Sequence, residues 1–384
     1  MEFDLTWLLL GLPLAFVLGW LASRFDLRQL REENRRAPKA YFKGLNYLLN
    51  EQQDQAIDAF IEAVQNDPDT TELHFALGNL FRRRGEYNRA VRVHEHLLSR
   101  GDLSRADRER AQHALALDFL KAGLLDRAED ALRRLEGTRF EAQARMALLS
   151  IYERSRDWQQ AADIARRMQE AQQGDFSTRQ AHYLCEQALA LAAHGEQSAA
   201  QALLERAIVT APQAARARIE LARLQQRMGQ ADLALATLHD LARAAPPALA
   251  LAAPLIVETA TATGCEPQAL ALLQQHYQNL PSLDLLEAVV TLETAARGPA
   301  AGREWYVRHL DKEPSLVAAT QWLAGETLAH EEFHPQIQRA LEQAAKPLTR
   351  YRCAACGFEA RQHFWQCPGC QTWDSYPARR VEEL

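Results

Sequence analysis

The chain has 384 residues, and its 50 Asp and Glu outnumber its 44 Lys and Arg, for a formal net charge of −6. This balance argues against nucleic acid as a partner, because nucleic-acid sites depend on strongly basic surfaces. Helical periodicity rich in Ala and Leu continues to about residue 348 without convincing strand alternation. The pattern therefore predicts an all-α fold for most of the chain.

The first predicted element is an uncharged stretch at residues 5–23, LTWLLLGLPLAFVLGWLAS. A helix of this length spans the hydrocarbon core of about 30 Å, and Trp7 and Trp20 lie near its ends as interfacial aromatic residues do. The alternatives are a cleaved signal peptide, a buried core helix and an interfacial helix. Signal peptides begin with basic residues, whereas this chain begins with Glu2 and Asp4, and an interfacial helix would show a polar face. We predict a transmembrane anchor over residues 1–23.

A basic juxtamembrane linker follows the span at residues 24–36 and carries Arg24, Arg28, Arg31, Arg35 and Arg36. By the positive-inside rule, this asymmetry predicts a periplasmic N-terminus and a cytoplasmic location for the rest of the chain. The linker can also contact anionic membrane lipid. Cytoplasmic thiols stay reduced, which favours metal binding over disulfides for the cysteines described below.

Residues 37–314 show a repeat of about 34 residues, the length of a tetratricopeptide helix pair. Small residues recur where two helices approach closely, and glycines recur at the turn between them. The recurrent alanines are Ala56, Ala90, Ala128 and Ala161, and the turn glycines are Gly85, Gly123, Gly195 and Gly229. A helical bundle with accidental spacing is the alternative. We predict a superhelical solenoid of seven to eight tetratricopeptide repeats, with terminal helices over 315–347.

The first helix of each repeat is expected to line a concave face that binds an extended or helical polypeptide. For any single residue on this face, a role in the core or on the solvated surface is the alternative. The candidate protein-binding residues are Tyr41, Phe42, Leu45, Phe75, Asn79, Arg82, Arg83, Arg223 and Arg227.

Residues 348–384 contain two CxxC pairs, formed by Cys353 and Cys356 and by Cys367 and Cys370. Two such turns supply four thiolates in a tetrahedron, which suits one iron or zinc ion. The segment is too short to bury a core of its own, so the metal is expected to supply much of its folding free energy. Four sulfurs leave no open coordination position, which predicts a structural role. Two disulfides, or four unrelated cysteines, are the alternatives.

The sequence contains no P-loop, dinucleotide-binding Gly-rich turn, HExxH pair or GxSxG elbow. The prediction is therefore that the chain is not an enzyme.

The order of one N-terminal span, a tetratricopeptide array and a rubredoxin-like four-cysteine knuckle resembles the lipopolysaccharide assembly protein B family of Gram-negative bacteria. The resemblance covers the full chain, and the family's metal ligands map onto Cys353, Cys356, Cys367 and Cys370. One departure from rubredoxin is Gln371, where the second knuckle usually has Gly.

The resemblance implies a single-pass adaptor of the cell inner membrane that modulates lipopolysaccharide synthesis. Such an adaptor presents the committed-step deacetylase of lipid A synthesis to the membrane AAA+ protease FtsH, and it contacts other lipopolysaccharide assembly membrane proteins. A homodimer is left open. Two alternatives remain: a non-proteolytic scaffold for lipopolysaccharide synthesis and export proteins, and an iron- or redox-sensing regulator.

Overall fold

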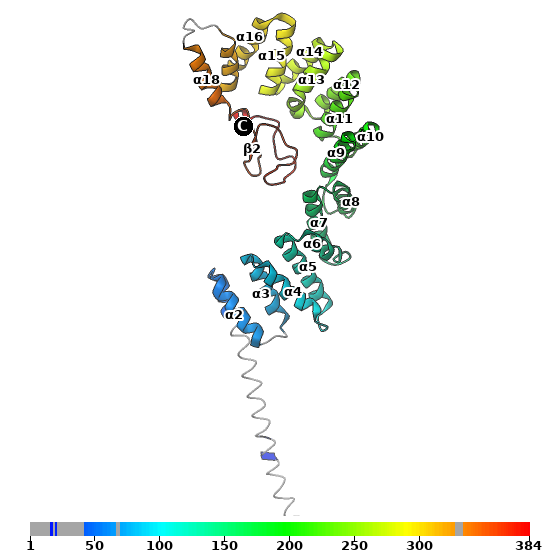
Figure 1. Cartoon of the computed structure of the whole chain (residues 1–384), viewed down its shortest axis with the longest axis vertical. Coiled ribbons are helices and arrows are strands. Elements are labelled where there is room, and N and C mark those ends of the chain that lie inside the picture. Colours follow the sequence, from blue (N-terminus) through cyan, green and yellow to red (C-terminus); the bar gives the residue numbers. More distant parts are fainter. Residues whose placement is uncertain (1–15, 18–19, 21–41, 67–69, 327–332) are drawn as a thin grey trace, which may run out of the picture. The chain divides into compact units, whose positions relative to one another are not determined.

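The computed structural model describes residues 16–17, 20, 42–66, 70–326 and 333–384. They divide into two compact units, Met1–Ser155 and Arg156–Leu384. The boundary between the units falls inside the predicted array (Figure 1).

The first unit consists of antiparallel helix pairs. Residues 42–49 are helical and precede the first named element. The helices that follow are α2 (Gln53–Asn66), α3 (Thr71–Arg84), α4 (Tyr87–Ser99), α5 (Arg105–Ala122), α6 (Leu125–Arg133) and α7 (Glu141–Ser155). Each helix packs on the next along the chain, as in a tetratricopeptide array.

The second unit consists of further helix pairs and ends in a small domain that contains the four cysteines, the candidate metal domain. Its helices are α8 (Trp158–Glu170), α9 (Ser177–Ala193), α10 (Gln197–Thr210), α11 (Ala215–Arg227), α12 (Ala231–Ala244), η1 (Pro246–Ala248), α13 (Leu249–Thr263), α14 (Glu266–Asn279), α15 (Leu283–Arg297), α16 (Pro299–Leu310), α17 (Leu316–Ala324) and α18 (His334–Ala345). The strands β1 (Tyr351–Arg352) and β2 (Glu359–Ala360) form an antiparallel hairpin, and η2 (Val381–Glu383) closes the chain. The predicted helical solenoid with a small C-terminal domain is confirmed.

Small residues determine how closely the helices of a pair approach. The recurrent alanines have no exposed surface at all: Ala56, Ala90, Ala128, Ala161, Ala200, Ala234 and Ala269. The turn glycines Gly85 and Gly123 have φ values of +84° and +76°, in the left-handed region that a residue without Cβ adopts at little cost. Their backbone N–H groups bond to carbonyls of the preceding helix and end it there.

Within the part of the chain that the structure describes, no helix combines the length and the apolar character needed to cross a membrane. The span predicted at residues 5–23 lies almost wholly outside the described residues, and so does the linker at 24–36. The anchor therefore stays a prediction from the sequence.

Candidate metal centre and hollows of the array

The four predicted ligands meet at one point of the C-terminal domain. The Sγ atoms of Cys353 and Cys370 are 3.8 Å apart, those of Cys356 and Cys367 are 3.7 Å apart, and all four sulfurs lie within 4.8 Å of one another. A tetrahedral zinc ion with Zn–S bonds of about 2.3 Å places its sulfurs about 3.8 Å apart. The four thiols therefore fit a single tetrahedral ion, with no position left for water or substrate.

Both knuckles have the same backbone turn. The N–H of Gly357 donates to the carbonyl of Cys353 at 2.9 Å, and the N–H of Gln371 donates to the carbonyl of Cys367 at 2.8 Å. The φ of Gly357 is +78° and that of Gln371 is +60°. Gln371 therefore adopts the left-handed conformation that favours glycine, at a cost of roughly 1 kcal/mol. The departure from rubredoxin leaves the turn itself intact.

Hydrogen bonds prepare part of the tetrad for metal binding. Burial raises the pKa of the Cys353 thiol, but its contact with Ser375, 3.2 Å away, and the N–H of Cys356 lower it more, to about 6. The hydroxyl and N–H of Thr372 also lower the pKa of Cys370. A thiolate is the form that binds a metal, so these contacts favour binding at neutral pH.

The aromatic residues of the domain have two different roles. Tyr351, Phe364 and Tyr376 cluster with the buried Cys353 and Cys367 and form an apolar shell over the sulfurs. Trp365 and Trp373 instead contact the array. The ring of Trp373 stacks on His182 of α9 at a centroid distance of 4.6 Å and meets the rings of Trp158 and Tyr183 edge-on at 6.1 Å each.

Polar contacts reinforce this docking. His182 Nε2 lies 2.8 Å from Oδ2 of Asp374. Arg380 donates to both oxygens of Asp284 at the start of α15, and the hydroxyl of Tyr351 donates to the same carboxylate at 3.0 Å. The guanidinium carbon of Arg380 also lies 4.1 Å from the centroid of the Tyr351 ring.

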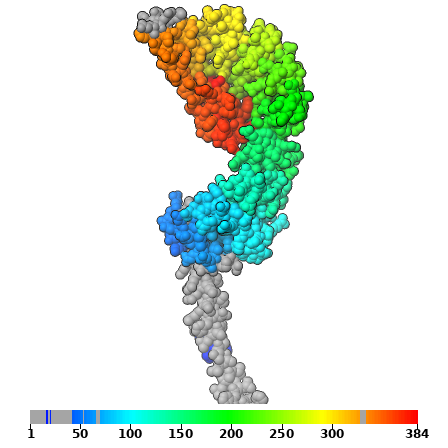
Figure 2. All heavy atoms as spheres, viewed as in Figure 1, coloured from blue at the N-terminus to red at the C-terminus, as the bar shows by residue number. Residues whose placement is uncertain are grey.

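The last residues of the chain cap helices of the array. A carboxylate oxygen of Glu382 accepts hydrogen bonds from the N–H groups of Leu316 and Val317, the first residues of α17, at 2.6 and 3.2 Å. Glu383 accepts one from Leu283, the first residue of α15, at 2.7 Å. Carboxylates at these positions satisfy free N–H groups and complement the helix dipole. The C-terminal domain thus packs against the N-terminal ends of α15 and α17. In Figures 1 and 2 it lies beside helices of the second unit.

Three predicted groove residues come together in the first unit. Phe75, Asn79 and Arg82 of α3 line a hollow of about 470 Å³, which we call the first hollow. It is completed by residues of α5 and by the segment that enters α7, which the sequence reasoning did not single out: Arg110, His113, Ala114, Leu117, Arg139, Phe140 and Gln143. These residues belong to the next two repeats. The only sequence signal for them is that they occupy the concave face of those repeats, as Phe75, Asn79 and Arg82 do in α3.

The other groove candidates lie elsewhere. Leu45 packs against the core of the first unit, Phe42 is exposed, and Arg83 is exposed outside the first hollow. Arg223 and Arg227 are exposed on α11 of the second unit, where Arg223 pairs with Glu220. Tyr41 lies outside the described residues.

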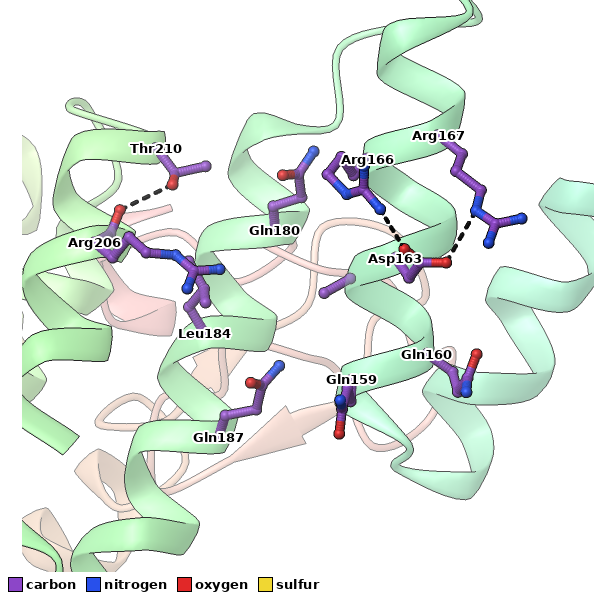
Figure 3. A pocket seen from close by; sticks show the side chains of 11 residues that line it. Gln159, Gln160, Asp163, Arg166, Arg167, Gln180, Leu184, Gln187, Arg206 and Thr210 are labelled. Carbon is purple, nitrogen blue, oxygen red and sulfur yellow. Dashed lines mark hydrogen bonds and ion pairs between the residues drawn. The ribbon is translucent and has the colours of Figure 1, made fainter. Parts of the chain in front are cut away.

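A second hollow, of about 680 Å³, lies on α8, α9 and α10 and was not predicted. Four of its eleven lining residues have amide side chains, namely Gln159, Gln160, Gln180 and Gln187 (Figure 3). Asp163, also in the lining, forms ion pairs with both Arg166 and Arg167. Arg206 is a third arginine of the lining, so one carboxylate faces three guanidinium groups there.

The chain matches two protein families. Residues 351–376 match the family described as "Rubredoxin metal binding domain", which includes all four cysteines. Residues 43–93 and 113–176 match the family described as "Tetratricopeptide repeat". Both predicted domain types are confirmed. The four cysteines whose sulfurs fit one metal ion lie within the first matched segment.

Two relatives match the chain nearly end to end. Lipopolysaccharide assembly protein B of Escherichia coli strain K12 is 29% identical over 385 residues, which cover 98% of this chain and 99% of the relative. The protein of the same name from Haemophilus influenzae is 26% identical over 402 residues, 96% of each chain.

Among solved structures, a tetratricopeptide repeat protein from Parabacteroides merdae aligns with a TM-score of 0.34 and 14% identity, over 67% of this chain and 98% of that one. A chain of Naa15/Naa10 bound to HypK aligns with a TM-score of 0.43 and 14% identity, over 82% of this chain and 48% of that one.

Proposed function

Because the chain is a homologue of lipopolysaccharide assembly protein B over nearly its full length, we propose that it is a membrane-tethered adaptor that modulates lipopolysaccharide synthesis. In this proposal it presents the committed-step deacetylase of lipid A synthesis to the membrane protease FtsH for degradation. It acts from the cytoplasmic side of the inner membrane, through the anchor predicted at residues 5–23.

The observation that carries the proposal is the docking of the metal domain on the array. Asp284 and Arg380, together with the helix caps Glu382 and Glu383, make the C-terminal domain part of the array's surface. The closed tetrad has no free coordination position for a reacting group, so its metal would stabilise this surface rather than perform chemistry. A rigid surface with hollows for side chains suits an adaptor, whose effect is to raise the effective concentration of one partner near another.

The anchor is the part of the proposal most directly open to test. In cells depleted of the native chain, we would express either the full chain or residues 24–384 and measure the steady-state amount of the deacetylase. The adaptor proposal expects the shorter chain to lower deacetylase levels much less than the full chain does. A chain with residues 1–23 replaced by an unrelated transmembrane helix should restore the effect. Full activity of the untethered chain would rule out tethering as the mechanism.

A second measurement separates the adaptor from a non-proteolytic scaffold. The half-life of the deacetylase is followed after protein synthesis is stopped, with active and with proteolytically inactive FtsH. An adaptor shortens the half-life only when FtsH is active. A chain that changes lipopolysaccharide synthesis equally in both backgrounds would be a scaffold.

A further inference from the structure

The first hollow has a positively charged lining, although the chain as a whole is acidic. Arg82, Arg110 and Arg139 are three of its ten lining residues, and none of the ten is Asp or Glu. The whole chain has a formal net charge of −6. A basic hollow on such a chain attracts a negatively charged group locally, without making the protein a general polyanion binder.

Aromatic rings hold two of these arginines in place. The guanidinium carbon of Arg110 lies 4.0 Å from the centroid of the Phe75 ring, and that of Arg139 lies 4.8 Å from the centroid of Phe140. His113 stacks on the other ring, Phe140, at 4.6 Å. Stacked guanidinium groups lose less conformational freedom when they bind a carboxylate, and the rings beside them offer apolar contact.

The three arginines differ in how far their charge is already neutralised. Arg82 bonds to the buried Asp118 at 2.8 Å and to Asn79, so it is held in the wall of the hollow. Arg110 pairs with Glu72, whose side chain is 60% exposed. Arg139 donates to the backbone carbonyl of Ala106 and has no carboxylate partner among the described residues. Arg110 and Arg139 are therefore the groups that an incoming carboxylate can engage.

The second hollow provides a contrast within the same chain. There Asp163 is one of the lining residues and pairs with both Arg166 and Arg167, while Arg206 also lines the hollow (Figure 3). The first hollow has no such internal carboxylate. The first hollow therefore differs from the second in having no carboxylate in its lining, and charge complementarity favours an acidic ligand there.

We propose that the first hollow binds an acidic segment of a partner polypeptide, with a carboxylate side chain between Arg110 and Arg139 and a neighbouring apolar side chain on the rings of Phe75 and Phe140. The volume of about 470 Å³ is in the range of sites that hold a few side chains. The hollow is built on α3, α5 and the entry to α7, the first helices of three successive pairs, the surface on which solenoids bind polypeptides. This inference rests on the proposed adaptor function and specifies the kind of segment that the array recognises.

The test uses the full chain in lipid nanodiscs and a fluorescein-labelled peptide that alternates Glu and Leu. Fluorescence anisotropy gives its Kd, and a peptide with Gln in place of every Glu is the comparison. We expect the Glu peptide to bind more tightly than the Gln peptide. Arg110→Gln and Arg139→Gln should each raise the Kd of the Glu peptide by about tenfold, the usual effect of losing one charge-assisted hydrogen bond.

Arg127→Gln is the matched control. Arg127 lies 4.3 Å over the ring of Phe119 and pairs with Glu95 at 3.0 Å, the same arrangement as Arg110, but it does not line the hollow. We expect the Arg127→Gln variant to bind the Glu peptide with the same Kd as the unaltered chain.

Equal affinity for the Glu and Gln peptides, or equal losses for Arg127→Gln and Arg110→Gln, would overturn the proposal. Displacement of the peptide by a single-stranded RNA oligonucleotide of higher affinity would do so too, since it would assign the basic lining to nucleic acid. The measurement contains neither deacetylase nor protease. A failed adaptor proposal would therefore leave a positive peptide result standing, and equal peptide affinities would leave the tethering experiment unaffected.

Discussion

The guanidinium of Arg380 bonds to both carboxylate oxygens of Asp284, 96 positions earlier in the chain, at 2.6 Å from Nη2 and 3.1 Å from Nε. The side chain of Asp284 is only 8% exposed, and the hydroxyl of Tyr351 bonds to the same carboxylate. One acidic residue at the start of α15 therefore holds both ends of the metal domain, because Tyr351 precedes the first knuckle and Arg380 follows the second.

Asp284→Asn should detach the metal domain from α15. The substitution leaves the charge of Arg380 in a largely buried place without its partner, a change that usually costs about 3–5 kcal/mol. Hydrogen exchange should become faster over residues 348–384, while α3 and α5 stay unchanged. Glu304→Gln is the control, because Glu304 pairs with Arg308 on the exposed surface of the same unit, where a pair contributes about 1 kcal/mol or less. Similar exchange in both variants would contradict the role of Asp284.

Gln371→Gly should stabilise the metal-bound domain by about 1 kcal/mol. Gln371 has a φ of +60°, and glycine adopts this conformation without the clash of a Cβ. The converse substitution, Gly357→Gln, places glutamine at the equivalent turn of the first knuckle, where φ is +78° and nothing lies within 4 Å of the added Cβ, and should cost a similar amount. Chelator competition measures metal retention in both variants. Effects of the same sign would mean that backbone strain does not set the stability of these turns.

The features that the sequence predicted well are local ones. Two CxxC pairs identify a metal tetrad, and recurrent Ala and Gly identify stacked helix pairs, because each pattern depends on residues within one turn or one repeat. The docking of the metal domain could not be predicted in the same way. Glu382 and Glu383 cap α17 and α15 from the other end of the chain, and no local signal pairs a cap with a distant helix.

The first hollow was predictable only in part, for a related reason. Phe75, Asn79 and Arg82 share one face of α3 at helical spacing, so the sequence places them together. Arg110 and Arg139 reach the same hollow from two later repeats, which depends on how the repeats stack.

Removal of the metal should loosen the array as well as the knuckle. The tetrad holds together a domain that is too small to fold alone, and that domain carries the caps of α15 and α17. After treatment with a strong chelator, or in Cys353→Ser, hydrogen exchange should become faster over residues 348–384 and at the first turns of α15 and α17. Cys265→Ser is the control, since Cys265 lies at the N-cap of α14, where serine is favourable. Loss of metal in both cysteine variants would contradict the assignment of the site.

Glu382→Ala should destabilise the start of α17 by about 1 kcal/mol, the usual effect of removing a helix cap. The carboxylate of Glu382 accepts from the N–H groups of Leu316 and Val317, so both lose a partner. Amide exchange at residues 316–318 should become faster, with the tetrad still loaded with metal. Leu384→Ala is the control, because Leu384 is an exposed neighbour of the cap. Ser315 is the N-cap of α17, and its Oγ accepts from the N–H of Ala318. Unchanged exchange in Glu382→Ala would show that Ser315 alone caps this helix.

The first unit should lose stability as the pH falls through about 6.5. Burial, assisted by the charge of Arg82, lowers the pKa of His113 below its ordinary value. As the pH falls, the unfolded chain therefore takes up a proton at His113 before the folded chain does. The free energy of unfolding decreases over this range and stops decreasing below the pKa of the folded chain. Amide exchange in α3 and α5, measured from about pH 7.5 to about pH 5.5 and corrected for the intrinsic rate, follows this loss. In His113→Gln the loss should be smaller, and an unchanged pH dependence would mean that His113 does not set it.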